Sequence, residues 1–128
     1  MALVSSRGIY AVAAIQVLYR HKEGALSIEK IATQANVPKN YLEQILLDLK
    51  RSGILKSIRG AKGGYTLAKD AKNITLLDII QSVESECCAD PCRTDDPILH
   101  SLWLEFNAHI KKFLDRPITY LDEYTKKT

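Results

Sequence analysis

The spacing of hydrophobic residues in the first half of the chain predicts three consecutive helices. Apolar residues recur every three or four positions over residues 6–21, which is the period of a helix that buries one face. A shorter helix is expected over residues 28–35, with Ser27 as its N-terminal cap. Pro38 then stands at the entrance to a third helix, and Gly53 ends that helix.

The third predicted helix has one apolar face and one polar face. Aliphatic side chains with helical spacing form the apolar face, namely Leu42, Ile45, Leu46 and Leu49. The opposite face mostly carries groups that can hydrogen-bond to base edges or phosphates, namely Lys39, Asn40, Glu43, Gln44, Lys50 and Arg51. Two helices joined by a tight turn, the second polar on its outer side, are typical of a helix–turn–helix.

A basic β hairpin is expected after these helices. Branched and aromatic residues at positions 54–58 and 65–67 predict two short strands. Between them, cations alternate with glycines that permit tight turns and a close approach to a ligand, namely Arg59, Gly60, Lys62, Gly63 and Gly64. Such a hairpin after a helix–turn–helix is typical of the wing of a winged-helix DNA-binding domain. Without that context it would be an ordinary surface hairpin.

The rest of the chain is expected to be helical. Thr75 and Asp78 resemble a capping box, with Asp where Glu or Gln is usual, and they open a short helix. Asp96 and Pro97 begin a long helix that extends to about residue 114, and a short last helix follows it.

An apolar stripe along the long helix predicts a homodimer. Its members are Leu99, Leu102, Trp103, Phe106, Ile110, Phe113 and Leu114, of which the first six are the expected dimerisation residues. The preceding domain is small and has its own core, so the stripe requires another partner, and a second copy of the same helix is the simplest one. The alternative is that the stripe packs only on the first helix of its own chain.

The expected fold is therefore mainly α. Residues 1–75 form a winged helix–turn–helix DNA-binding domain with a two-stranded β wing, and residues 76–128 form a cysteine-containing loop and a helical dimerisation region. Charge divides the chain at the same place. Residues 1–75 hold 12 Lys and Arg against 5 Asp and Glu, a net charge of +7, whereas residues 76–128 hold 6 against 10, a net charge of −4. A basic half is a candidate nucleic-acid surface, although mild basicity is also common on solvated faces.

Composition and motifs argue against membrane proteins and enzymes. The sequence has no run of about 18 apolar residues and no secretory signal at its start, so a cytoplasmic protein is expected. The run from Gly60 to Gly64 lacks the Lys-Ser or Lys-Thr pair of a phosphate-binding loop, and no Cys-x-x-Cys pair is present. We therefore expect a protein that is not an enzyme, with a small thiol oxidoreductase as the less favoured alternative.

Five segments in fixed order resemble the Rrf-two family of bacterial winged helix–turn–helix regulators, which includes the IscR, NsrR and CymR types. They are SRGIYAV at 6–12, YLEQ at 41–44, SIRGAKGGY at 57–65, ITLLDII at 74–80 and HSLW at 100–103. The resemblance covers nearly the whole chain. It implies a dimeric transcription factor, commonly a repressor, that binds a double-stranded DNA operator. Its recognition helix would read the major groove while the wing approaches the minor groove.

The resemblance also identifies expected DNA contacts. It assigns a role in base selection to Glu43 and a wing contact to Arg59 and Gly60. Together with the polar and basic positions described above, the expected DNA-binding residues are Arg7, Lys39, Asn40, Tyr41, Glu43, Gln44, Lys50, Arg51, Ser57, Arg59, Gly60 and Lys62.

Three cysteines in one short segment form a candidate sensor. Cys87, Cys88 and Cys92 are the only cysteines, and clustered thiols in a cytoplasmic protein favour metal, cluster or redox chemistry. In IscR- and NsrR-like members, three cysteines of this loop hold an iron–sulfur cluster, and the IscR type adds a histidine at the place of His100. The resemblance therefore implies a metal site of Cys87, Cys88, Cys92 and His100.

The cysteine spacing departs from that pattern and leaves alternatives open. Two of the cysteines are adjacent, which makes joint ligation of one iron awkward, and the loop is short, as in the CymR type, which lacks a cluster and is controlled by a partner enzyme of cysteine synthesis. Besides a cluster, the alternatives are a Cys₃His zinc site, reversible thiol oxidation favoured by the nearby Arg93, control by a regulatory partner protein without a cofactor, and an incidental loop.

Overall fold

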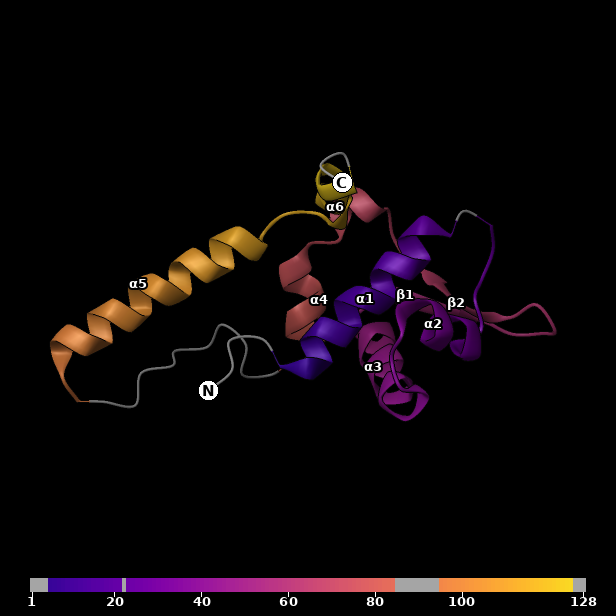
Figure 1. Ribbon diagram of the computed structural model, residues 1–128, viewed down its shortest axis with the longest axis horizontal. Coiled ribbons are helices and arrows are strands. Elements are labelled where there is room, and N and C mark those ends of the chain that lie inside the picture. The colour runs from indigo at the N-terminus through magenta and orange to yellow at the C-terminus, as the bar shows by residue number, and fades with distance from the viewer. Residues whose placement is uncertain (1–4, 22, 85–94, 126–128) are drawn as a thin grey trace.

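The computed structural model describes residues 5–21, 23–84 and 95–125, and it is mainly helical (Figure 1). The described residues include a two-stranded antiparallel sheet. Both features confirm the predicted fold class. In chain order the elements are α1 (Ser6–Arg20), α2 (Ile28–Ala35), α3 (Lys39–Arg51), β1 (Leu55–Ile58), β2 (Gly64–Leu67), the 3₁₀ turn η1 (Ala71–Asn73), α4 (Leu76–Val83), α5 (Pro97–Leu114), the 3₁₀ turn η2 (Ile118–Tyr120) and α6 (Leu121–Thr125).

One hydrophobic core joins the elements on both sides of residue 75. α1 packs against α2, α3 and α4, and Figure 1 shows α4 alongside α1. Ile79 of α4 and Ile118 of η2 belong to the same buried cluster as the helix–turn–helix. Because one core spans residue 75, the two parts of the chain pack together. The division at that residue into a DNA-binding part and a dimerisation part stays a prediction. The predicted apolar face of α3 is fully buried, at Leu42, Ile45, Leu46 and Leu49.

The turn between α2 and α3 follows from its local sequence. Ser27 caps α2, its Oγ accepting a hydrogen bond from the Lys30 N–H at 3.3 Å. Asn36 ends α2 in the left-handed conformation with a φ of 57°, which asparagine tolerates better than most residues. Buried Val37 then returns the chain to the core, and Pro38 precedes α3 as its N-cap residue. The helix–turn–helix is thereby held by one cap, one left-handed residue and one apolar anchor.

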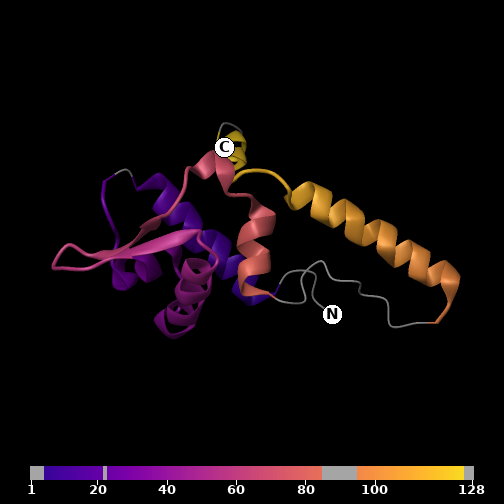
Figure 2. The ribbon, with the colours of Figure 1, turned by 180° about the vertical axis from the view of Figure 1, so that it is seen from behind.

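The wing docks on the segment before α2. β1 and β2 pair with Leu55 opposite Leu67, and the hairpin projects from the body in Figures 1 and 2. Leu26 extends the pairing by one bridge, because its N–H donates to the Tyr65 carbonyl at 3.0 Å and its carbonyl accepts from the Tyr65 N–H at 2.8 Å. The base of the wing is fixed to the helix–turn–helix, while its tip is exposed.

Two wing glycines are required by the chain's own backbone. A Cβ at Gly64, whose φ is 148°, would lie 2.1 Å from the Leu26 carbonyl oxygen, and one at Gly63 would lie 2.2 Å from the Ile58 carbonyl oxygen. Gly60, at the exposed tip, has a φ of 115° and nothing within 4 Å of its Cβ position. All these glycines were expected to permit tight turns and a close approach to a ligand. At Gly63 and Gly64 the close approach is instead to the protein itself.

Gly64→Ala is expected to reduce the free energy of unfolding by about 2–4 kcal/mol, because it combines an unfavourable φ with a clash against Leu26. Gly60→Ala is the matched control, since it has a positive φ without a clash, and should cost about 1–2 kcal/mol. Urea unfolding at fixed protein concentration measures both. Equal losses in the two variants would show that the contact with Leu26 does not constrain position 64.

The segment after α5 returns to the core. The Ile118 N–H donates to the Ile74 carbonyl at 2.9 Å, and the Tyr19 hydroxyl donates to the Asp122 carboxylate at 2.7 Å. That hydrogen bond is the main cause of a raised pKa for Tyr19. At the start of α4, Thr75 and Asp78 form the predicted capping box.

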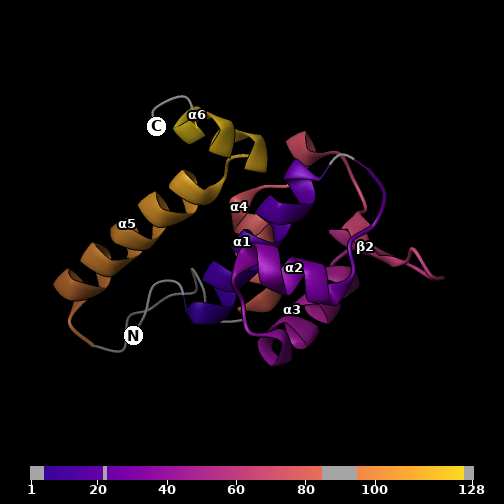
Figure 3. The same cartoon turned by 45° about the vertical axis from the view of Figure 1, so that its right-hand side comes forward.

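α5 extends away from the body (Figures 1 and 3), and no residue of α5 is buried. Its C-terminal end contacts the body, where Ile110 and Leu114 pack around Ile80 of α4. Among the residues that the structure describes, packing therefore covers the stripe mainly at that end. The large apolar side chains of α5 that remain open have exposed fractions of 78% for Ile98, 42% for Leu99, 52% for Leu102, 41% for Trp103, 43% for Leu104 and 50% for Phe113.

Candidate nucleic-acid interface

The outer face of α3 collects most of the predicted contact residues. All seven of the α3 residues named in the sequence analysis are exposed, namely Lys39, Asn40, Tyr41, Glu43, Gln44, Lys50 and Arg51. The first three lie in the opening turn, where the helix dipole favours an approaching anion such as a phosphate. Leu47 was missed. Its side chain is 42% exposed, and its spacing of four residues from Glu43 places it on the same face, where an apolar group suits a thymine methyl.

Two contacts hold the start of α3. Lys39 Nζ lies 2.9 Å from the Glu29 carboxylate of α2. Their hydrogen bond is the main cause of a lowered pKa for Glu29 and a raised pKa for Lys39. The Tyr41 ring lies 6.0 Å from the Tyr10 ring of α1, centroid to centroid. Lys39 and Tyr41 are thus positioned by neighbouring helices while they stay open to solvent.

Arg7 of α1 lies in an internal network instead of free on the surface. Its guanidinium forms an ion pair with Asp48 of α3, and its Nε donates to the Val83 carbonyl of α4 at 3.3 Å. Asp48 Oδ1 also accepts a hydrogen bond from Gln44 Nε2 at 3.0 Å, and it lies 3.7 Å from Arg51 Nη1. Three predicted contact residues therefore converge on one carboxylate that the sequence analysis did not single out.

The exposed wing carries the other predicted contacts. Ser57, Arg59, Gly60 and Lys62 are all exposed, and so is Ile58, at 44%, which the sequence analysis did not include. The wing tip therefore presents two cations beside one apolar side chain.

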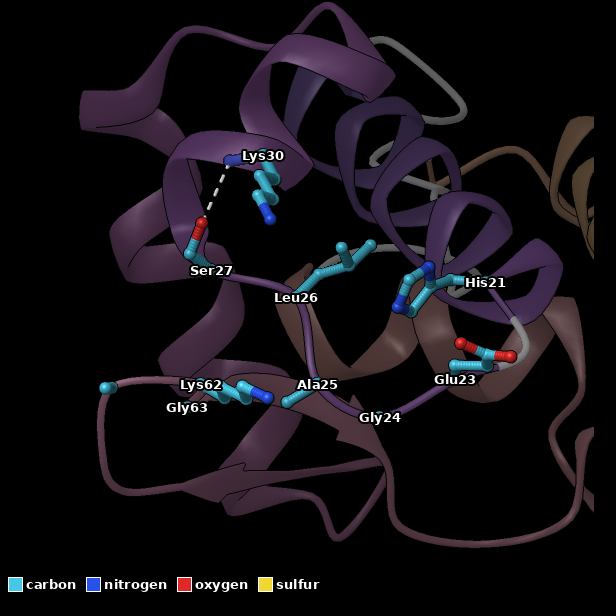
Figure 4. A pocket seen from close by; sticks show the side chains of 10 residues that line it. His21, Glu23, Gly24, Ala25, Leu26, Ser27, Lys30, Lys62 and Gly63 are labelled. Atoms are coloured by element: carbon cyan, nitrogen blue, oxygen red, sulfur yellow. Dashed lines mark hydrogen bonds between the residues drawn. The ribbon is translucent and has the colours of Figure 1, made fainter.

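A hollow lies between the wing and the connection from α1 to α2 (Figure 4). Lys62 lines it from the wing, Ala25 from the connection and Lys30 from α2. Glu23 supplies a carboxylate to the same hollow. Lys30, which was also missed, thus adds to the basic surface near the wing.

The predicted metal ligands are only partly described. Cys87, Cys88 and Cys92, together with Arg93, lie outside the described residues. His100 is half-buried near the start of α5. Within residues 5–21, 23–84 and 95–125, no three His, Cys, Asp or Glu side chains gather in a way that would hold a metal ion. In those same parts of the chain, none of the helices combines the length and the apolar character needed to cross a membrane.

A family model, related sequences and solved structures all relate this chain to transcriptional regulators. The model of the Rrf2 family, described as iron-dependent transcriptional regulators, matches residues 4–119. The HTH-type transcriptional regulator CymR of Bacillus subtilis is 34% identical over 114 residues, which are 88% of this chain and 83% of CymR. The HTH-type transcriptional regulator IscR of Photorhabdus laumondii is 32% identical over 119 residues, which are 87% of this chain and 73% of IscR.

Solved structures show the same relationship. The structure of B. subtilis CymR, named in its title as the global cysteine regulator, superposes with a TM-score of 0.82 at 33% identity and covers 97% of this chain and 98% of CymR. The oxidized form of Staphylococcus aureus CymR gives a TM-score of 0.80 at 32% identity, again over 97% and 98% of the two chains.

Proposed function

The chain belongs to the Rrf2 family of transcriptional regulators, and from this premise we propose that it is a homodimeric, sequence-specific repressor whose affinity for DNA responds to iron, redox or cysteine status. It is a DNA-binding regulator and not an enzyme. The observation that carries the finer proposal is the outer face of α3, where polar side chains lie exposed above a fully buried apolar face and directly before a cationic wing. The proposed site of action is the cytoplasm.

Each part of the proposed DNA-binding domain has its own task. α3 enters the major groove, and Glu43 there accepts hydrogen bonds from base edges while it repels phosphate, so it selects sequence more than it adds affinity. Arg59 and Lys62 of the wing approach the minor groove, where negative potential attracts cations. Lys50 and Arg51, at the end of α3, are expected to contact the phosphate backbone of the DNA.

The proposed dimer forms through α5. Two copies of its exposed apolar side chains would bury one another across a twofold axis. The operator is then expected to be roughly palindromic, with half-sites about one helical turn apart, because two recognition helices related by that axis meet successive major grooves.

The proposed sensor is the cysteine segment. Three thiols with the His100 imidazole are donors that suit iron–sulfur clusters and zinc, and the family description as iron-dependent supports an iron-responsive member. When bound, a cluster would supply a charge and redox state that reports iron supply. The residues themselves would hold it as thiolates and as a neutral imidazole nitrogen.

A second candidate is the same repressor without a cofactor, controlled by a partner protein. The similarity to CymR and the adjacency of Cys87 and Cys88 favour it, since two adjacent thiols are awkward ligands for one iron. Reversible oxidation of the thiols is a further route in that case, and S. aureus CymR has been solved in an oxidized form.

The test of the proposed DNA contacts is a pair of variants measured against a randomised duplex library. Glu43→Ala should broaden the bases tolerated at one position of each half-site while total affinity changes little. Arg59→Ala should instead lower affinity about tenfold for all sequences and reduce the salt dependence of binding, because it removes a cation. If Glu43→Ala leaves the base preference intact, α3 does not read sequence in the proposed way.

A further inference from the structure

Asp48 connects the base-facing side of α3 to two other helices. Its Oδ2 pairs with the Arg7 guanidinium of α1, and its Oδ1 accepts the Gln44 Nε2 hydrogen bond at 3.0 Å. The Asp48 side chain is only 18% exposed, and that of Arg7 is 39% exposed. A partly shielded and charge-assisted contact of this kind is stronger than an ordinary surface ion pair.

Arg7 is held at its other edge by the end of α4. Its Nε donates to the Val83 carbonyl at 3.3 Å, and the neighbouring Glu84 carboxylate accepts a hydrogen bond from the Ser5 backbone N–H. The guanidinium therefore spans from α4 to α3, with its charge balanced by Asp48. A phosphate contact by Arg7 would have to use the N–H groups that these two bonds leave over, and Asp48 already offsets the charge of the guanidinium.

The network fixes the orientation of one base-facing amide. Because the Gln44 NH₂ group donates to Asp48, its carbonyl oxygen and one remaining N–H are left to face outward in a defined order. An amide with a fixed order of donor and acceptor discriminates between base edges, whereas one that can flip accommodates the opposite pattern as well.

We infer that Arg7 and Asp48 are positioning residues that determine base preference through Gln44, and that Arg7 makes no phosphate contact. This inference rests on the proposed role of α3 in the major groove. It differs from the sequence-based expectation, which placed Arg7 among the DNA contacts.

The experiment measures the base preference of the full-length dimer on a randomised operator library, and its affinity for the preferred operator over a series of salt concentrations. Arg7→Ala and Asp48→Asn should each reduce discrimination about tenfold at the base that Gln44→Ala also affects. Neither substitution should change the slope of affinity against salt. In a Gln44→Ala background, Arg7→Ala should cause no further change in base preference, because its effect passes through Gln44.

A conservative variant of Arg7 and variants of the exposed Gln44 test the inference even if Arg7→Ala is unstable. Arg7→Lys keeps the charge beside Asp48 and should restore much of the discrimination lost in Arg7→Ala. Gln44 lies on the surface, so Gln44→Ala and Gln44→Ala/Asp48→Asn give the comparison even if Arg7→Ala fails to fold.

Two results would overturn the inference. A uniform loss of affinity with a salt slope lowered by about one phosphate would make Arg7 a backbone contact. An unchanged base preference in all Arg7 and Asp48 variants would show that the network does not orient Gln44. A wild-type protein without any sequence preference would instead refute the proposed function itself.

Discussion

Leu102→Asp is expected to convert the proposed dimer into monomers and to lower operator affinity by about a thousandfold or more. Leu102 is 52% exposed on α5, among other exposed apolar side chains. Burial of one leucine contributes about 2 kcal/mol, and an unpaired carboxylate facing an apolar partner adds a desolvation cost. A twofold interface carries each substitution twice, so the loss is doubled.

Sedimentation velocity measures the assembly, and thermal unfolding measures the fold. Because Leu102 lies outside the buried core, the secondary structure of the monomer should be retained. Ala108→Asp is the matched control, since it puts the same charge on α5 at an exposed position on the opposite side of the helix. A Leu102→Asp protein that stays dimeric and binds its operator would exclude the α5 stripe from the interface.

The helices could be predicted because their buried residues recur with the period of the helix. The four apolar positions of α3 share one face, so the core that covers Leu42 must also cover Ile45, Leu46 and Leu49. The helix caps could be predicted as well, since Ser27 and the Thr75–Asp78 pair form hydrogen bonds within three residues of sequence. Local chemistry sufficed for these features, and they are confirmed.

Contacts between distant residues could not be predicted in this way. Arg7 was predicted as a DNA contact, while its partners Asp48 and Val83 are 41 and 76 residues away in the sequence. The glycines of the wing show the same limit. Tight turns at these glycines could be predicted from the sequence, whereas the contact of Gly64 with the Leu26 carbonyl depends on how the wing docks. The 3₁₀ turn Ala71–Asn73 was also missed, because three residues carry no period.

Replacement of Cys87, Cys88 and Cys92 by serine is expected to abolish the whole regulated change in operator affinity. The segment that contains them joins α4, which packs in the DNA-binding core, to α5, the proposed dimer helix. Chemistry there can change how the two recognition helices are spaced, and such coupling typically changes affinity by about 5- to 150-fold. Serine hydroxyls neither form disulfides nor replace thiolates as ligands for iron or zinc.

The measurement compares operator affinity with and without iron and sulfide, and before and after peroxide, in protein prepared without oxygen. The triple variant should give one affinity under all conditions. His100→Ala separates the chemistries, because it should impair a response that depends on a metal or cluster but leave thiol oxidation intact. Suppose instead that the wild-type protein stays colourless after anaerobic reconstitution and its affinity ignores oxidants. The thiols are then not the sensor, and control of the repressor by a partner protein becomes the function to test.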